Sequence, residues 1–214
     1  MRFQVATIAG LLMVGQAVAA PAPSAPLTAR DGKTAAEIIG EISPNSKTCD
    51  GSAECRTADQ IGPLMADAML KYGVYSPGQI AGIIALTAFE TVDYKYKHNV
   101  SPGRAGQGTS NMQQFNYNLQ YAQSIPALKS QVTGVDVNAA DDKRNEVLAL
   151  VTPDEYNFGS GPWFLTTQCT SAVQEALKKG DDAGFEQYMG CVGVTLTQQR
   201  TDYWTRAKSA FGLA

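Results

Sequence analysis

The composition of residues 80–89 strongly constrains where this segment can lie in the fold. Within residues 80–89 the only polar side chain is that of Thr87. Ser76 and Pro77 come just before it, a helix-capping residue and one that suits the first helical position. A helix that is apolar around its whole circumference is buried on every side. We therefore expect a central buried helix that ends at Glu90.

Most of the remaining chain shows the apolar spacing of amphipathic helices. The clearest start is Thr57, which with Gln60 forms a capping box before a helical run that Gly73 stops. Further helical patterns cover residues 33–42, 111–123, 126–132, 142–151, 162–169, 171–179, 182–189 and 197–211.

Residues 92–110 do not follow the helical pattern. They hold two turn signals, around Pro102 and Gly106. Tyr94 and Tyr96 are two residues apart, the spacing that a strand places on one face. The sequence thus predicts an α+β fold that is predominantly α-helical, with a small β-hairpin lobe after the central helix.

The amino terminus has the pattern of a secretory signal peptide. Arg2 precedes an almost wholly apolar run over residues 3–18, which closes on the small-x-small pattern of Ala17 and Ala19. A transmembrane anchor is the alternative, but the apolar run is short for one. The expected division is a signal peptide over 1–19, an Ala/Pro-rich linker or pro-segment with a short helix over 20–48, and the folded domain over 49–214. We expect a secreted, extracellular protein.

Secretion makes the four cysteines candidates for disulfide bonds. Four cysteines allow three pairings. We favour the two local bridges, Cys49–Cys55 and Cys169–Cys191, over the crossed pairings and over free buried thiols.

Composition excludes several classes of function. The formal net charge is −3 and one histidine is present, so binding to nucleic acid through neutralised phosphates is not expected. A zinc site lacks ligands if the cysteines are paired. A serine hydrolase would need His98 with Ser101 or Ser110, and no nucleophile-elbow motif surrounds either serine. We expect no cofactor, no metal and no membrane partner, and a monomer.

Glu90 is the first candidate for chemistry. It closes the apolar helix, and apolar surroundings disfavour the charged form of a carboxyl group. A carboxyl group kept protonated in this way acts as the general acid in glycoside hydrolysis. The alternative is that Glu90 caps a backbone group or faces water.

The residues after Glu90 are rich in amides, hydroxyls and aromatic rings, which suit the binding of sugars. The candidate substrate-binding residues are Tyr94, Tyr96, Asn99, Gln107, Thr109, Asn111 and Gln113. A polar turn region without a ligand is the alternative. Asn99 also begins a glycosylation sequon, which we expect to be unoccupied because Pro102 follows it.

Several segments together resemble secreted fungal proteins of the lysozyme-like superfamily. They are Ala88–Tyr96, Pro102–Arg104, Gly106–Thr109, Asn111–Gln113, Pro153–Tyr156, Trp163–Cys169 and Tyr203–Trp204. The resemblance covers about residues 49–211 and implies a lysozyme-like fold. It also implies a muramidase-type activity on cell walls and a catalytic glutamate at the end of a central helix, the position of Glu90.

The second catalytic group has several candidates. Asp93 is the first choice, because it is close to Glu90 in sequence. Asp154 and Glu155 are alternatives, and a neutral side chain such as that of Gln107, Thr109 or Asn111 could position water. The spacing of the two carboxyl groups distinguishes a retaining from an inverting enzyme, and the sequence leaves it open.

The function predicted from these observations is a secreted glycoside hydrolase that cleaves β-1,4 linkages in peptidoglycan. A chitinase- or chitosanase-like hydrolase is an alternative, and a non-catalytic protein that binds cell-wall glycans is another. The net negative charge fits poorly with an anionic bacterial surface as the target.

Overall fold

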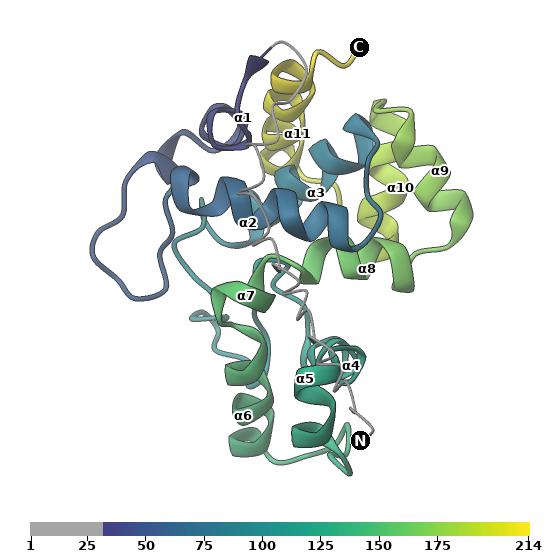
Figure 1. Cartoon of the computed structure of the whole chain (residues 1–214). Coiled ribbons are helices and arrows are strands. Elements are labelled where there is room, and N and C mark those ends of the chain that lie inside the picture. The colour runs from purple at the N-terminus through teal and green to yellow at the C-terminus, as the bar shows by residue number, and fades with distance from the viewer. Residues whose placement is uncertain (1–31) are drawn as a thin grey trace, which may run out of the picture.

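The computed structural model of the chain describes residues 32–214, and Figure 1 shows their arrangement. The expected signal peptide and the first part of the expected linker lie outside the described residues. The elements are α1 (Ala35–Ile42), η2 (Pro44–Lys47), α2 (Ala58–Lys71), α3 (Pro77–Glu90), α4 (Phe115–Ser124), α5 (Pro126–Lys129), η3 (Ser130–Val132), α6 (Asp141–Val151), α7 (Asp154–Asn157), α8 (Ser160–Gln168), α9 (Ser171–Lys178), α10 (Asp182–Val192) and α11 (Gln198–Phe211).

The expected central helix is confirmed as α3. Nearly all of its side chains are buried, and it packs against α1, α8, α9 and α11. Gly78 lets α9 approach closely, because a Cβ atom at this position would lie 2.4 Å from the carbonyl oxygen of Leu177. The apolar circumference of α3 is therefore covered from several directions at once.

Local sequence signals predicted some of the helix starts correctly and others incorrectly. Thr57 and Gln60 form the expected capping box at the start of α2. The side chain of Ser76 makes no capping bond, although Pro77 does occupy the first turn of α3. The helix expected from residue 111 begins only at Phe115, because the preceding residues fold into turns.

The helix α1 lies within the segment that the sequence suggested was a linker or pro-segment with a short helix. Its Ile38, Ile39 and Ile42 are buried in the main hydrophobic core. Thr34 and Glu37 form a capping box at its start. The part of this segment that the structure describes thus contributes to the packed domain.

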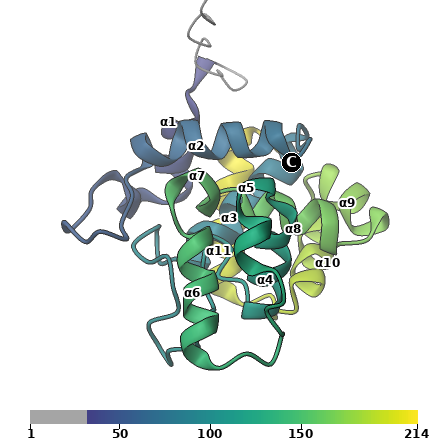
Figure 2. The same cartoon turned by 60° about the horizontal axis from the view of Figure 1, so that its bottom comes forward.

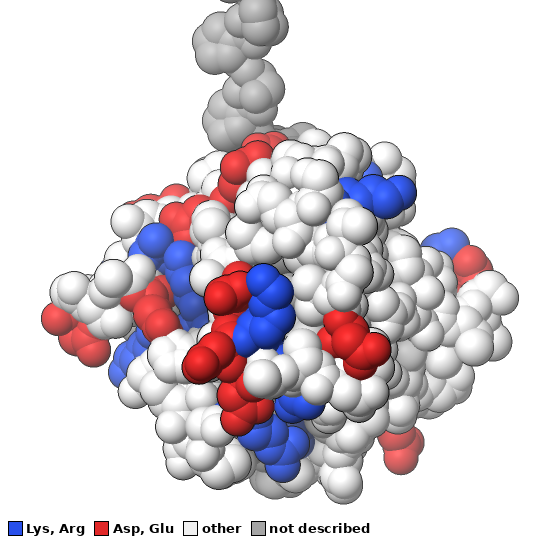
Figure 3. Space-filling view, turned by 90° about the horizontal axis from the view of Figure 1, so that it is seen from below, with Lys and Arg blue, Asp and Glu red and all other residues white. Residues whose placement is uncertain are grey.

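Helices α4, α5 and α6 form a lobe below the layer of α1, α2 and α3 (Figure 1), and this lobe comes forward in Figure 2. Contacts between α4 and α6 and between α4 and α5 hold the lobe together. On the face seen from below, acidic and basic side chains lie next to one another (Figure 3). This face therefore carries no large area of a single charge.

The β-hairpin lobe was predicted wrongly. Over residues 92–110 the structure has turns, with isolated bridges between His98 and Gly108 and between Gly108 and Gln113. Val92, Asp93 and Tyr94 have φ angles of 53°, 59° and 62°, so the chain makes a left-handed turn directly after α3. Extended pairing cannot start from such a turn, because strands need negative φ angles. The described residues are predominantly α-helical and contain no strand.

Both expected disulfide bonds are present. Cys49 and Cys55 close a short loop before α2, and Cys169 and Cys191 join the end of α8 to α10. Within residues 32–214, no helix has the length and apolar character needed to cross a membrane.

Candidate functional site

The structure places the candidate acid Glu90 in an ion pair. Its Oε1 atom lies 2.8 Å from Nη2 of Arg200 on α11, and the Glu90 side chain is 18% exposed. The Arg200 guanidinium also lies over the ring of Phe89, 4.5 Å from its centroid. A general acid must present its carboxyl group to the substrate, whereas this ion pair directs the Glu90 carboxylate to Arg200. Arg200, 110 residues later in the sequence, thus pairs with the carboxylate at the end of the apolar helix.

Asp93 belongs to a different network from that of Glu90. It is 6% exposed and accepts hydrogen bonds from Ser43 (2.5 Å), Asn45 (2.9 Å) and Tyr203 (2.8 Å). Burial raises the pKa of Tyr203, and its hydrogen bond to Asp93 raises this pKa further, so the phenol remains a donor. These donors occupy the carboxylate and join the turn after α3 to η2 and α11. Asp93 therefore has a structural role.

The two tyrosines expected to share one face have different surroundings. Tyr94 is 3% exposed, and its hydroxyl group lies 3.0 Å from Oγ1 of Thr87 on α3. Tyr96 is 38% exposed. Tyr94 is thus a core residue that contacts Thr87, the only polar side chain within residues 80–89.

The candidate amides and hydroxyls after residue 98 mostly serve the backbone and one another. Asn99 donates to Gln107, and Gln113 donates to Asn118. Thr109, Asn111 and Gln113 are buried. Most of these groups hold the irregular loop together, because a segment without regular structure must satisfy its buried backbone groups through side chains.

The alternative carboxylates Asp154 and Glu155 start α7. Asp154 binds Nε of Arg56 at 2.6 Å and Nζ of Lys97 at 2.5 Å, whereas Glu155 is exposed. Burial acts to raise the pKa of Asp154, but the hydrogen bonds from Arg56 and Lys97 outweigh it, so this pKa lies below its ordinary value. Asp154 thus fixes the loop after α3 against α7.

Replacing Asp154 with Asn is expected to lower the free energy of unfolding by about 1–2 kcal/mol at pH 7, because Lys97 loses a charged partner. A carboxyl group whose pKa is lowered by folding stabilises the fold above its unfolded value of about 4. That stability is lost as the pH falls through the folded value. Urea unfolding between pH 7 and pH 2.5 should therefore show the two proteins converging below about pH 4. A constant difference across this range would contradict the assignment.

His98 contacts Glu54 and neither of the serines considered from the sequence. Its Nδ1 atom lies 2.5 Å from Oε1 of Glu54, and Ser110 instead donates to the carbonyl group of Asn157. No group of three or more His, Cys, Asp or Glu side chains within residues 32–214 is arranged to hold a metal ion.

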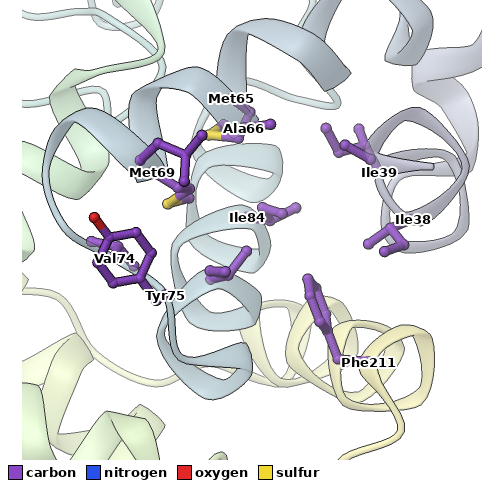
Figure 4. A pocket seen from close by; sticks show the side chains of 12 residues that line it. Ile38, Ile39, Met65, Ala66, Met69, Val74, Tyr75, Ile84 and Phe211 are labelled. Carbon is purple, nitrogen blue, oxygen red and sulfur yellow. The ribbon is translucent and has the colours of Figure 1, made fainter. Parts of the chain in front are cut away.

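A feature that the sequence analysis missed is an apolar pocket of about 300 Å³ between α1, α2, α3 and the end of α11. Figure 4 shows its side chains, with Met65 and Met69 from α2 and Ile84 from α3 facing the same space as Ile38 from α1. The lining residues are Ala35, Ile38, Ile39, Met65, Ala66, Met69, Leu70, Val74, Tyr75, Ile80, Ile84 and Phe211.

The pocket opens to the surface beside two apolar residues. Leu70 is 44% exposed and Tyr75 is 68% exposed. No lining residue is charged, and the Tyr75 hydroxyl is the only hydroxyl group among the lining side chains. Met65 and Met69 lie four residues apart on α2, a spacing that sequence analysis reads as a core stripe. The spacing alone does not show whether neighbouring helices fill the space beside these two side chains.

Comparison with known proteins gives one informative similarity. The chain is 48% identical over 157 residues to a bifunctional dioxygenase (DOX)-epoxy alcohol synthase (EAS) of Fusarium oxysporum (strain Fo5176). The matched region is 72% of this chain and 12% of that relative, so the chain spans only a small part of its length. No protein-family model matches the chain. No solved structure matches it either.

This similarity corrects the function predicted from the sequence. The relative is named for dioxygenase and epoxy alcohol synthase activities, a different class of enzyme from a glycoside hydrolase. The predictions of a muramidase, a hydrolase and a role in cell-wall degradation were therefore wrong. The ion pair of Glu90 and the filled hydrogen-bonding sites of Asp93 agree with this correction.

Oxygenase chemistry commonly depends on a bound redox-active metal. All four cysteines are in disulfides, which removes every thiolate. His98 is the only histidine, and Glu54 holds its Nδ1 atom. This donor set does not fit a metal centre that needs several histidine or cysteine ligands within residues 32–214.

Proposed function

We propose that this chain is a non-catalytic binding domain for an aliphatic molecule and that the pocket between α1, α2, α3 and α11 is its binding site. The observation that carries the proposal is the pocket itself, whose volume of about 300 Å³ falls within the range of small-molecule sites. Its lining is uncharged, so it suits an alkyl chain.

The proposal agrees with the similarity to the fungal relative. An epoxy alcohol is an oxygenated product of an unsaturated hydrocarbon, so the relative's name implies a largely apolar substrate. Within the described residues, the cysteines are paired and His98 is the only imidazole, so a centre with several such ligands does not fit. A binding role for such a molecule is compatible with both facts.

The methionine side chains that line the pocket suit a ligand with an unbranched alkyl chain. Methionine side chains are flexible and polarisable, and they adapt to chains of varied shape. Met65 and Met69 form one wall, and Phe211 contributes from α11. The rim residue Tyr75 offers a hydroxyl group to an oxygen atom of the ligand.

We further propose that the protein is secreted. Its two disulfides are compatible with an oxidising compartment. Extracellular or membrane lipids are then within reach of the binding site.

The binding test uses displacement of the uncharged fluorescent probe N-phenyl-1-naphthylamine by 1-alkanols from hexanol to dodecanol. Each buried methylene contributes about 0.8 kcal/mol, so affinity is expected to rise about fourfold per carbon until the pocket is full. Because no cation lines the pocket, 1-decanol is expected to bind at least as tightly as decanoate.

The matched variants place a tryptophan inside or outside the pocket. Ala66→Trp on α2 fills the space and should weaken decanol binding at least tenfold. Ala172→Trp adds the same side chain on the exposed face of α9 and should leave binding unchanged. Leu70→Ala, at the exposed rim, should weaken binding a few-fold without disturbing the core.

Three results would overturn the proposal: affinity independent of chain length, equal binding by the two tryptophan variants, or consumption of dioxygen by the purified protein with an unsaturated fatty acid.

A further inference from the structure

A second cavity lies between the loop after α3, the start of α4 and α6, whereas the apolar pocket is bordered by α1 and α2. Figure 1 shows α4 and α6 in the lower lobe and α1 and α2 in the upper layer. The second cavity has a volume of about 400 Å³, and polar residues form much of its wall. The lining residues that matter here are Arg104, Phe115, Val137, Asp141 and Arg144.

Packing holds the side chain of Arg144 on α6 in place, but not all of its N–H donors have a hydrogen-bond partner in the described residues. Its guanidinium group lies over the ring of Phe115, 5.4 Å from the centroid. Its Nε atom is buried and has no hydrogen-bond partner in the described part of the chain. The nearest carboxylate is that of Asp141, at 3.8 Å from Nη1 and with a side chain 78% exposed. Because Nε is enclosed, a ligand can reach only the exposed third of this side chain, where Nη1 has no carboxylate among residues 32–214 closer than that of Asp141.

Arg104 reaches the same cavity from the loop after α3. The loop is fixed, because the N–H of Gly103 donates to Asn99 and that of Gly106 donates to Asn145. Gly106 has a φ angle of 73°, and a Cβ atom there would lie 2.9 Å from the Cβ of Arg144. The close packing thus brings the backbone next to Arg104 against Arg144.

The charge of Arg104 is not neutralised within the protein. It is exposed, and no carboxylate within residues 32–214 forms an ion pair with it. Two guanidinium groups therefore line one cavity with a single exposed carboxylate, that of Asp141, at its edge. The local charge favours an anion.

We propose that this cavity binds a small phosphate monoester, with Arg104 and Arg144 on its phosphate group. A guanidinium group binds oxyanions through two parallel hydrogen bonds, which gives it an advantage over a lysine. A phosphate monoester carries close to two negative charges near neutral pH, so the two arginines attract it more strongly than they attract a singly charged carboxylate. Val137, which is 57% exposed, and the ring of Phe115 provide apolar contacts for the organic part.

The test titrates phenyl phosphate into ¹⁵N-labelled protein, with inorganic phosphate and benzoate as separate arms. Phenyl phosphate is expected to shift the Nε–Hε signal of Arg144 and the backbone signals of residues 103–107. Arg104→Gln and Arg144→Gln should each weaken binding about tenfold or more. Lys129→Gln removes a positive charge from exposed α5 and serves as the control of equal charge, with no expected change.

Arg104→Gln keeps the test decisive if Arg144→Gln fails to fold, because Arg104 is exposed. Inorganic phosphate is expected to bind more weakly than phenyl phosphate, and benzoate more weakly still. Equal binding of benzoate and phenyl phosphate, equal weakening by Lys129→Gln, or the absence of saturable binding would overturn the proposal.

Discussion

Replacing Asp93 with Ala is expected to lower the free energy of unfolding by about 2–4 kcal/mol, because it leaves the buried hydroxyl group of Ser43 and two more exposed donors without their acceptor. These donors are the hydroxyl groups of Ser43 and Tyr203 and the amide of Asn45. The Asp93 backbone also has a φ angle of 59°, which alanine adopts less readily than aspartate. Both effects act in the same direction.

Two further variants separate these effects. Asp93→Gly accepts the left-handed backbone but removes the same hydrogen bonds, so it should be about 1 kcal/mol more stable than Asp93→Ala. Asp93→Asn keeps one acceptor oxygen and should lose less stability than either. Urea unfolding of the three variants measures the differences. A loss below 1 kcal/mol for Asp93→Ala would show that the network does not hold the turn after α3.

Removal of the disulfide between Cys169 and Cys191 by a double substitution to Ala is expected to cost about 3 kcal/mol. The bridge closes a segment with a sequence separation of 22, and its loss increases the entropy of the unfolded chain. The same substitution at Cys49 and Cys55, with a separation of 6, should cost about 2 kcal/mol because the loop is shorter.

Denaturant unfolding of the two double variants, with and without a reducing agent, checks this order. The reducing agent breaks both bonds, so the wild type and the two double variants should have about the same stability when all are reduced. A larger effect for the Cys49–Cys55 loop would contradict the argument from loop length.

Those parts of the fold that depend on local signals could be predicted from the sequence. The apolar run before Glu90, the capping box of Thr57 and Gln60, and the local spacing of the cysteines each specify their structure within a few residues. Interactions between nearby residues determine such features, so no knowledge of distant contacts is needed.

The surroundings of the candidate site residues depend on contacts that are distant in the sequence. No pattern near Glu90 shows that Arg200, 110 residues later, neutralises it. No pattern near Asp93 shows that Ser43 and Tyr203 bind its carboxylate. The turn signals after α3 were real, but three consecutive left-handed residues redirect the chain where a hairpin was expected.

The apolar pocket could not be predicted for a related reason. Ile38, Met65, Met69 and Ile84 have the periodicity of an ordinary core. Whether a core is filled or leaves a space depends on how three or four helices meet, which the sequence of each helix alone does not determine.

The central claim is that an aliphatic ligand occupies the pocket between α1, α2, α3 and α11. The most direct measurement is an NMR titration of 1-decanol into protein with ¹³C-labelled isoleucine and methionine methyl groups. We predict saturable shifts for Ile38, Ile39, Met65, Met69 and Ile84, with Ile61 and Ile125 unchanged, since the latter two are buried elsewhere. Shifts of Ile61 or Ile125 as large as those of the pocket residues, or no saturable shift at any methyl group, would contradict the account.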